Sequence, residues 1–433
     1  MSSLVLISLA AILVWSLIAH RFERWGVAGP AALLLLGAAT VAWDVEEFGE
    51  IIDSGLAEKS VEIILAILLF VDATEVKGGV FGKEGKVIAR LVLIALPLSL
   101  MLALVSGAFL LPSTGLLVIA VIACVIMPTD FAPATRLLRG RGISTRTRQI
   151  LNIESGYNDG LISPVFGMSL ALAVFWSTIS HTPDDELTDS AIEKPLEQFL
   201  AAFLGAVPAT LLAIAIGLLL GCTIGFAVRI ARGKDIASAV GARYVMVLLP
   251  LIAYGIANLP VFTANGFVAA FVAGVGYRLT RVRSTEESGI DHSELLLVDE
   301  VGVLAANFVW FMLGGAVLLV FASGIDWGVV LLALLALTLI RMLPVYVSLM
   351  GSSVLRKDRV LIGALGPRGT ASIVFGLLAY NALPDHEGTI VLSVMVVTVM
   401  GSILLHGVVA PLVLRRRGAG RGDVAVPGSA TGG

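Results

Sequence analysis

The chain has 433 residues, of which 58% are hydrophobic and 14% are charged, and its formal net charge is −3. This composition excludes a water-soluble protein and indicates that lipid surrounds most of the chain. We therefore expect a polytopic, all-helical membrane protein in the cell membrane, with the lipid bilayer as a partner, no nucleic-acid partner and no cofactor.

Thirteen apolar runs are long enough to cross roughly 30 Å of hydrocarbon. In chain order they lie near residues 3–20, 26–43, 61–76, 87–111, 114–138, 152–178, 199–228, 236–258, 261–279, 300–322, 327–350, 360–383 and 388–414. No basic residue precedes the first run and no cleavage site of small residues follows it, so we expect it to remain as a span. Glu62, near the end of the third run, is expected to be a surface residue.

The charges of the loops predict the orientation, because cytoplasmic loops collect Lys and Arg. Every second loop is basic, beginning with Arg21 and Arg24, and the last basic cluster is 415–417. The other loops are acidic or very short, such as the one that holds Asp44, Glu46 and Glu47. This alternation predicts an N-terminus outside and a C-terminus inside. Residues 1–417 are expected to form one membrane domain, and residues 418–433 a short disordered cytoplasmic tail.

Two spans contain residues that interrupt a helix. Pro128 and Pro133 flank Thr129 and Asp130 in the fifth span, and the twelfth span is interrupted at 366–369 by Gly-Pro-Arg-Gly. Each proline removes a backbone donor and disfavours helical geometry at the preceding residue. Paired interruptions at corresponding places indicate a transporter built from inverted repeats, with its substrate site at the breaks. The two spans are seven apart, so they are expected to cross the bilayer in opposite directions.

Both breaks contain an ionisable residue, and half-helix ends in the membrane carry partial charges that such residues can offset. We expect Asp130 to cap bare N–H groups where the second half of the fifth span begins. Arg368 is expected to offset the carbonyls at a half-helix C-terminus.

The sixth span begins with a polar cluster, Glu154-Ser-Gly-Tyr-Asn-Asp159, at the head of a long apolar run. At 100° per residue Ser155 and Asp159 share one stripe, whereas Glu154 lies roughly 140° from Asp159. One carboxylate is therefore expected to do chemistry and the other to support structure. Arg341 in the eleventh span needs a buried partner, and Glu154 is the predicted one.

Asp159 is the carboxylate that remains for chemistry. Its neighbour Asn158 can form hydrogen bonds but cannot ionise, so the site has a single titrating group. Removal from water favours the protonated form, so near neutral pH Asp159 is expected to hold either a proton or a hard cation. Ser155 and the broken backbone at Thr129 would supply further oxygens to that cation. Competition at one carboxylate predicts an electroneutral, one-for-one exchange.

Several motifs together resemble the monovalent cation/proton antiporters of the NhaP and sodium/proton exchanger branch. They are Thr129-Asp130 in a Pro-broken helix, the run at 154–159, the stretch from Asn265, the Gly-Pro-Arg-Gly at 366–369 and the ending from His406. The resemblance runs from the third span to the last. It implies thirteen helices with two broken, crossing helices, a homodimer, and a six-helix core whose rigid-body movement gives alternating access.

The resemblance also implies roles for individual residues. Asp159 would carry the cation, Na⁺ first and Li⁺ or K⁺ as alternatives, in exchange for H⁺. Asn158 would support the site, and Ser155 and the Thr129 main chain would be ligands. Asp130 would compensate helix ends, and Glu154 would pair with Arg341. The family commonly has a glutamate where this chain has Asp72, and a water-mediated contact suits the shorter side chain.

Three other classes of protein are alternatives to this interpretation. An intramembrane aspartic protease would use Asp130 and Asp159 as a dyad that shares a proton, but it needs neither a buried arginine nor broken helices. A passive cation channel would need several weak sites along a filter, whereas the sequence offers one concentrated carboxylate site. A symporter of organic anions would need more basic or aromatic residues at the membrane midplane than Arg341 and Arg368 supply.

Overall fold

A computed structural model describes residues 3–25, 27–76, 84–134, 143–181, 189–282 and 290–410. The expected tail at 418–433 and the last basic cluster at 415–417 lie outside these residues. The same holds for the segment 135–142, which includes the expected second half of the fifth span.

The described part of the chain is helical, and each of the thirteen expected spans contains a helix. The first half comprises α1 (Ser3–Trp25), α2 (Gly29–Val41), α3 (Val45–Ile52), α4 (Gly55–Glu75), α5 (Gly85–Arg90), η1 (Leu91–Ala95), α6 (Leu96–Leu110), α7 (Leu116–Ile126), η2 (Ala132–Ala134) and α9 (Thr145–His181). The second half comprises α10 (Asp189–Gly233), α11 (Ala239–Ala257), α12 (Gly266–Arg281), α13 (His292–Ser323), α14 (Trp327–Leu337), α15 (Leu339–Ser348), α16 (Arg356–Ala364), α17 (Thr370–Ala382), α18 (Asp385–Ser402) and η3 (Ile403–Val409).

Eight helices or helix pairs of the described chain are long and apolar enough to cross a membrane, and three shorter apolar helices accompany them. The shorter ones are α2, α7 and α17. Two of these three, α7 and α17, belong to the spans that the sequence predicts to be broken. Their shortness is therefore the structural result of the interruptions, because each covers only part of the membrane thickness.

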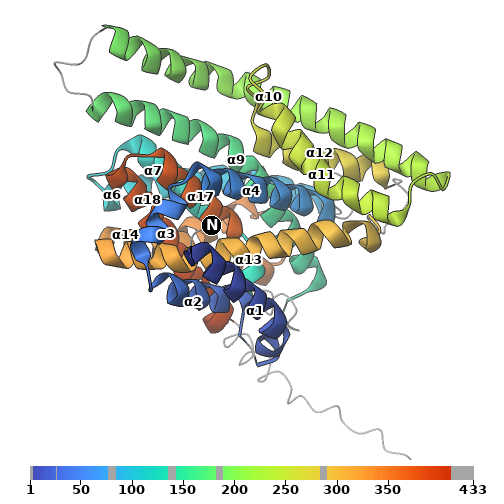
Figure 1. Ribbon diagram of the computed structural model, residues 1–433, viewed down its shortest axis with the longest axis horizontal. Helices are drawn as coiled ribbons and strands as arrows, with labels where there is room; N and C mark the ends of the chain where they lie inside the picture. The colour runs from blue at the N-terminus through green and yellow to red at the C-terminus, as the bar shows by residue number, and fades with distance from the viewer. Residues whose placement is uncertain are drawn as a thin grey trace, which may run out of the picture.

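The helices form two groups. On one side α10, α11 and α12 lie together, and Figure 1 shows α10 along the edge of the molecule with the other two beside it. α12 packs closely against α10, where a side chain at Gly221 would lie 2.2 Å from the carbonyl oxygen of Ala273. Small residues at membrane helix contacts allow such a close approach. The other group contains α5–α7, α9 and α14–α18. α4, α9 and α13 contact helices of both groups, and α1–α3 pack against α13.

A third break lies in the eleventh span at Thr338, where neither neighbour is Pro or Gly; the proline of this span, Pro344, lies six residues further on, inside α15. The backbone at Thr338 takes φ −124° and ψ −95° and separates α14 from α15. Backbone at membrane depth that leaves helical geometry has to be buried in protein or line a cavity. This break releases carbonyl groups next to Arg341, and one of them is used by the site described below.

Outside the spans, an ion pair joins α5 to α9. Arg146 donates to both carboxylate oxygens of Glu84, at 2.7 and 2.8 Å, and also to the Ser353 carbonyl oxygen between α15 and α16. The hydrogen bonds from Arg146 lower the pKa of Glu84 below its ordinary value of 4.5.

A carboxyl group whose pKa is lowered by folding stabilises the protein above its unfolded pKa, and this contribution is lost as the pH falls through the folded pKa. We therefore expect Glu84→Gln to lower the melting temperature at pH 7, by a small amount because the pair is partly exposed. The difference from the wild type should vanish in acid, below the folded pKa. Melting curves of both proteins across this pH range measure it, and a constant difference at all pH values would contradict the role of the charge.

Candidate ion-binding site

The two predicted breaks meet in space. The backbone N–H of Asp130, just after α7, donates to the carbonyl oxygen of Pro367, in the segment between α16 and α17, at 2.9 Å. This hydrogen bond joins residues that are 237 positions apart in the sequence. It gives one backbone polar group of each interrupted helix a hydrogen-bond partner, at a membrane depth where lipid offers no such partner.

Each charged residue of a break serves the other broken span. Arg368 is fully buried and donates to the carbonyl oxygens of Met127 and Pro128, where α7 ends. Asp130 accepts from the backbone N–H and the hydroxyl of Thr370, at 2.9 and 2.6 Å, where α17 begins. A cation thus faces a negative helix end and an anion faces a positive one, as the helix dipole favours.

This arrangement extends the sequence prediction for Asp130. Its Oδ1 also accepts from the N–H of Ala132 at 2.7 Å, which is the expected local contact. The contact to Thr370 was not expected, because the sequence does not show which distant helix end lies beside it. Arg368 contacts carbonyl oxygens at a half-helix C-terminus, as expected from the sequence. Its Nη2 also donates to the Ala336 carbonyl oxygen near the break in the eleventh span.

Glycine is required where the second break passes these charges. A side chain at Gly366 would lie 1.9 Å from Nε of Arg341, and one at Gly369 would lie 2.3 Å from Oδ2 of Asp130. Both neighbours are held by several hydrogen bonds and have little freedom to move away. The Gly-Pro-Arg-Gly motif therefore combines a helix break with the space for two charged side chains.

We expect Gly366→Ala to destabilise the protein by about 1–3 kcal/mol or more, the usual cost of overpacking. Thermal unfolding in detergent measures the effect. Gly255→Ala is the matched control, because a side chain there meets nothing within 4 Å inside α11. The control should be neutral or slightly stabilising, since Ala favours helix over Gly. Equal melting temperatures for the Gly366 variant and the wild type would contradict the packing inferred at this break.

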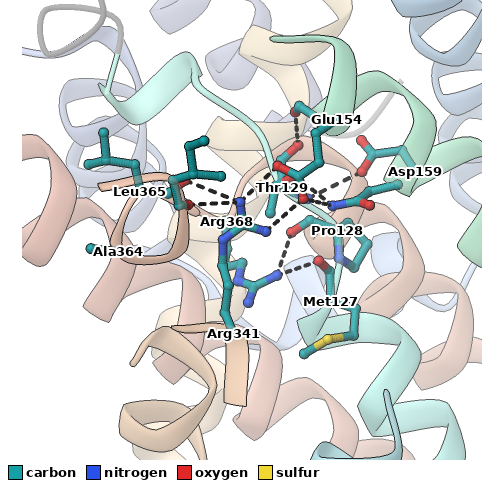
Figure 2. Close-up of polar contacts among 12 residues, drawn as sticks. Met127, Pro128, Thr129, Glu154, Asp159, Arg341, Ala364, Leu365 and Arg368 are labelled. Atoms are coloured by element: carbon teal, nitrogen blue, oxygen red, sulfur yellow. Dashed lines mark hydrogen bonds and ion pairs between the residues drawn. The ribbon is translucent and has the colours of Figure 1, made fainter. Parts of the chain in front are cut away.

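Glu154 and Arg341 form a buried ion pair, as Figure 2 shows beside the break at Met127–Thr129. Two nitrogens of Arg341 donate to the two carboxylate oxygens of Glu154, at 2.9 and 2.8 Å. The same guanidinium donates to the Leu365 carbonyl oxygen at 3.2 Å, just beyond the end of α16. Arg341 therefore offsets the C-terminus of α16 as Arg368 offsets that of α7.

Asn158 connects the ion pair to the first break. Its Nδ2 donates to Glu154 at 2.7 Å and lies 3.2 Å from the hydroxyl of Thr129. Its carbonyl oxygen Oδ1 is buried and has no hydrogen-bond partner among the described residues. An unsatisfied buried acceptor is costly, and it is a candidate ligand for a cation or a water molecule.

Asp159 differs from the other two acids of the cluster. Its Oδ1 accepts one long hydrogen bond, 3.3 Å, from the N–H of Thr129. In contrast, Glu154 is paired with an arginine, and Asp130 accepts three hydrogen bonds. Asp159 is buried yet makes no ion pair with the described residues, so it is the carboxylate that remains available to a proton or a cation.

A cavity of about 410 Å³ reaches this carboxylate, and we call it the first cavity. Its walls include Asp159, Ser155 and Thr129. The hydroxyl of Ser155 donates to the carbonyl oxygen of Thr129, so these two oxygens lie together beside the first break. Carboxylate, hydroxyl and main-chain carbonyl oxygens are the ligand types that hard cations prefer.

Asp72 lines the same cavity from α4. α4 and α9 approach closely there, because a side chain at Gly156 would lie 3.2 Å from Cβ of Asp72. The structure therefore brings Asp72, Thr129, Asp130, Ser155 and Asp159 to one cavity. The other predicted residues do not line the first cavity. A separate small space of about 10 Å³, beside the first break, is lined by Asn158, Glu154, Arg341 and Arg368.

Sequence reasoning missed three polar residues of the first cavity: Asn152, Asp299 and Thr370. Asp299 of α13 has a buried oxygen, Oδ1, without a partner among the described residues. Its position just before the tenth expected span was the available signal, but charges at span ends are usually interfacial. Glu62 was placed wrongly: only 16% of its side chain is exposed, and it accepts a hydrogen bond from Tyr254.

Residues 5–416 match the family described as "Sodium/hydrogen exchanger, transmembrane". The chain belongs to this family. A search of curated protein sequences gives no match. This exchanger chain therefore embeds in the membrane by many spans, mediates cation/proton antiport and is not an enzyme.

Two solved structures of the sodium proton antiporter MjNhaP1 from Methanocaldococcus jannaschii resemble this exchanger. The structure at pH 8 has a TM-score of 0.68 and 21% identity, over 93% of this chain and 98% of that one. A structure from an electron microscopy map has a TM-score of 0.61 and 19% identity, over 99% and 100% of the two chains. The likeness shows the fold, which is that of the NhaP antiporters expected from the sequence.

Proposed function

We propose that this exchanger moves one sodium ion against one proton at Asp159 by alternating access. One observation carries the proposal: at the end of the first cavity, Asp159 is the buried acid of the described cluster that has neither an ion pair nor a full set of hydrogen bonds. A proton and a cation would compete for its oxygens. Each form leaves the site neutral, so the expected exchange is electroneutral.

The proposed sodium ligands are Asp159, Ser155 and the main-chain oxygen of Thr129. In the sodium-free, deprotonated state Asp159 would carry an uncompensated buried charge, which is unfavourable away from water. Either a proton or a cation removes this penalty. Asn158 holds the Thr129 segment against Glu154, and Asp72 lines the same cavity, where a water molecule could join it to the cation.

The remaining roles are proposed on the same basis. Glu154, Arg341 and Arg368 would hold the half-helix ends in place, and Asp130 would fix the start of α17. These residues would keep the ligands in position without binding the cation. A protease dyad of Asp130 and Asp159 is not favoured, because Asp130 is held by Thr370 and Asp159 by Thr129, and no hydrogen bond joins the two acids among the described residues.

We also propose that the protein is a homodimer in the cell membrane, with its N-terminus outside and its C-terminus in the cytoplasm. The alternating charge of the loops supports the orientation, and the resemblance to the antiporter branch supports the dimer. Cysteine labelling from each side tests the orientation, and cross-linking in native membranes tests the dimer.

Transport in proteoliposomes tests the proposed function. Vesicles that contain the purified protein and an imposed proton gradient should lose the gradient when sodium is added, and lithium and potassium are tested in the same way. No response to any of the three cations would overturn the proposal. Repeating the measurement with and without a membrane potential tests the stoichiometry, because electroneutral exchange does not respond to the potential.

A further inference from the structure

A second large cavity lies between the two helix groups, further along the same helices. It has a volume of about 510 Å³, and we call it the second cavity. Its walls include Glu58, Lys59 and Glu62 of α4, Phe166 of α9, Tyr254 of α11 and Leu378 of α17. The first cavity is lined by α4 from Leu65 to Val76, so the two cavities follow each other along α4.

α4 presents acidic side chains to both cavities. Asp72 lines the first cavity, and Glu58 and Glu62 line the second, where Glu62 is the acid that Tyr254 contacts. Asp72 and Glu62 are ten residues apart, which is about 15 Å along a helix and places them within about 80° of each other around its axis. These two carboxylates therefore lie on the same half of α4, one at each cavity.

Glu62 is oriented but incompletely bonded. The Tyr254 hydroxyl donates to its Oε2 at 2.7 Å, and the Lys59 ammonium lies 2.8 Å from the same oxygen. The other oxygen, Oε1, has no hydrogen-bond partner among the described residues. The Lys59 side chain is 66% exposed, and such a pair is weak and easily replaced. A cation from solution can therefore compete with Lys59 for this carboxylate.

Aromatic rings and two serines lie between the cavity-lining stretches of α9 and α17. Phe166 of α9, which is part of the wall of the second cavity, stacks on Phe375 of α17 with ring centroids 4.4 Å apart. The hydroxyls of Ser163 and Ser372, on the same two helices, are buried and have no hydrogen-bond partner among the described residues. Ser163 follows Asp159 by four residues on the same stripe of α9. Two unsatisfied hydroxyls between the lining residues of the two cavities indicate a route for a polar ligand from one cavity to the other.

We propose that the second cavity is the opening of the transport path on the opposite membrane face, with Glu62 as the carboxylate that attracts the cation there. This rests on the proposed function, because it names the route of the same cation. Lys59 weakens this attraction, because its ammonium group forms an ion pair with the Glu62 carboxylate and repels arriving cations. The loop charges predict that this face is extracellular.

The test is the apparent KM for sodium at each face, measured with everted and right-side-out membrane vesicles. Glu62→Gln should raise KM at the face of the second cavity by about tenfold, the low end of the range for charge-focused clefts. KM at the other face should stay unchanged. Gln keeps the size of the side chain and its acceptor for Tyr254, so the fold is expected to persist.

Two further variants sharpen the result. Lys59→Gln should lower KM at the same face, opposite in sign to Glu62→Gln. Glu46→Gln is the matched control: this exposed acid lies on α3, in the loop on the same face, away from the cavity. It should leave KM unchanged. Raised salt should reduce the effects of Glu62→Gln and Lys59→Gln, because it screens charges.

The outcomes separate the two proposals. If the wild-type protein shows no exchange, the proposed function fails. If the wild type exchanges but Glu62→Gln leaves both KM values unchanged, or raises both equally, the role of Glu62 is wrong and the proposed function stands. A rise at one face only, together with the opposite shift for Lys59→Gln, supports the route through the second cavity.

Discussion

Replacement of Asp159 by Asn is expected to abolish cation-dependent loss of the proton gradient for sodium, lithium and potassium alike. The Asn side chain has nearly the same shape and can still accept the hydrogen bond from the N–H of Thr129. It cannot bind and release a proton at any working pH. The variant therefore removes the competition between proton and cation while it leaves the packing of α9 unchanged.

Two measurements accompany this variant. Its melting temperature should equal or exceed that of the wild type, because a buried carboxyl group without an ion pair is replaced by a neutral amide. Asp44→Asn is the matched control: Asp44 caps α3 outside the site, and Asn caps helices as well as Asp does. The control should transport normally. Normal exchange by the Asp159 variant would show that the carrier group lies elsewhere.

Much of the fold follows from the sequence, because each span has to be apolar over the thickness of the bilayer. The charge of the loops also alternates between the two sides of the membrane. The breaks in the fifth and twelfth spans were also predictable, since Pro and Gly have direct effects on the backbone. The break at Thr338 could not be predicted from the sequence. No residue there forbids a helix, and the change of direction places Arg341 and the Ala336 carbonyl where other spans need them.

Some contacts of the candidate site could likewise be inferred from the sequence, and others could not. Helical spacing separates Glu154 from Asp159 on α9, and a lone buried arginine requires an acid, so the pair of Glu154 and Arg341 could be inferred. The partners of Asp130 and Arg368 could not, because their contacts join residues about 240 positions apart. Nothing local in a sequence indicates that a charge will serve another helix rather than its own.

Residues near span ends posed a different difficulty. Glu62 and Asp299 occupy positions where an acid is commonly interfacial, and composition does not distinguish a carboxylate that faces lipid headgroups from one that lines a cavity. The difference arises from the space between the two helix groups, which depends on packing across the whole molecule. Both acids were therefore recognised as cavity residues only in three dimensions.

The largest expected loss of stability comes from Arg341→Ala. The change leaves Glu154 as a buried, unpaired carboxylate and frees the Leu365 carbonyl oxygen at the end of α16. Removal of one partner of a buried ion pair typically costs about 3–5 kcal/mol. We expect a strongly lowered melting temperature and yield of folded protein, measured by thermal unfolding and size-exclusion chromatography in detergent.

A double variant shows whether the cost comes from the orphaned charge. Arg341→Met combined with Glu154→Gln removes both charges, so it should be more stable than Arg341→Met alone, although each substitution removes native contacts. Arg356→Ala is the control, because Arg356 is exposed at the start of α16 and should change stability by no more than about 0.5 kcal/mol. If the double variant is as unstable as the sum of the single variants, the two side chains do not act as a pair. A partial rescue of stability that also brings back part of the transport would place this pair in the scaffold that holds the broken helices, apart from the carboxylate at Asp159 that exchanges its proton for a cation.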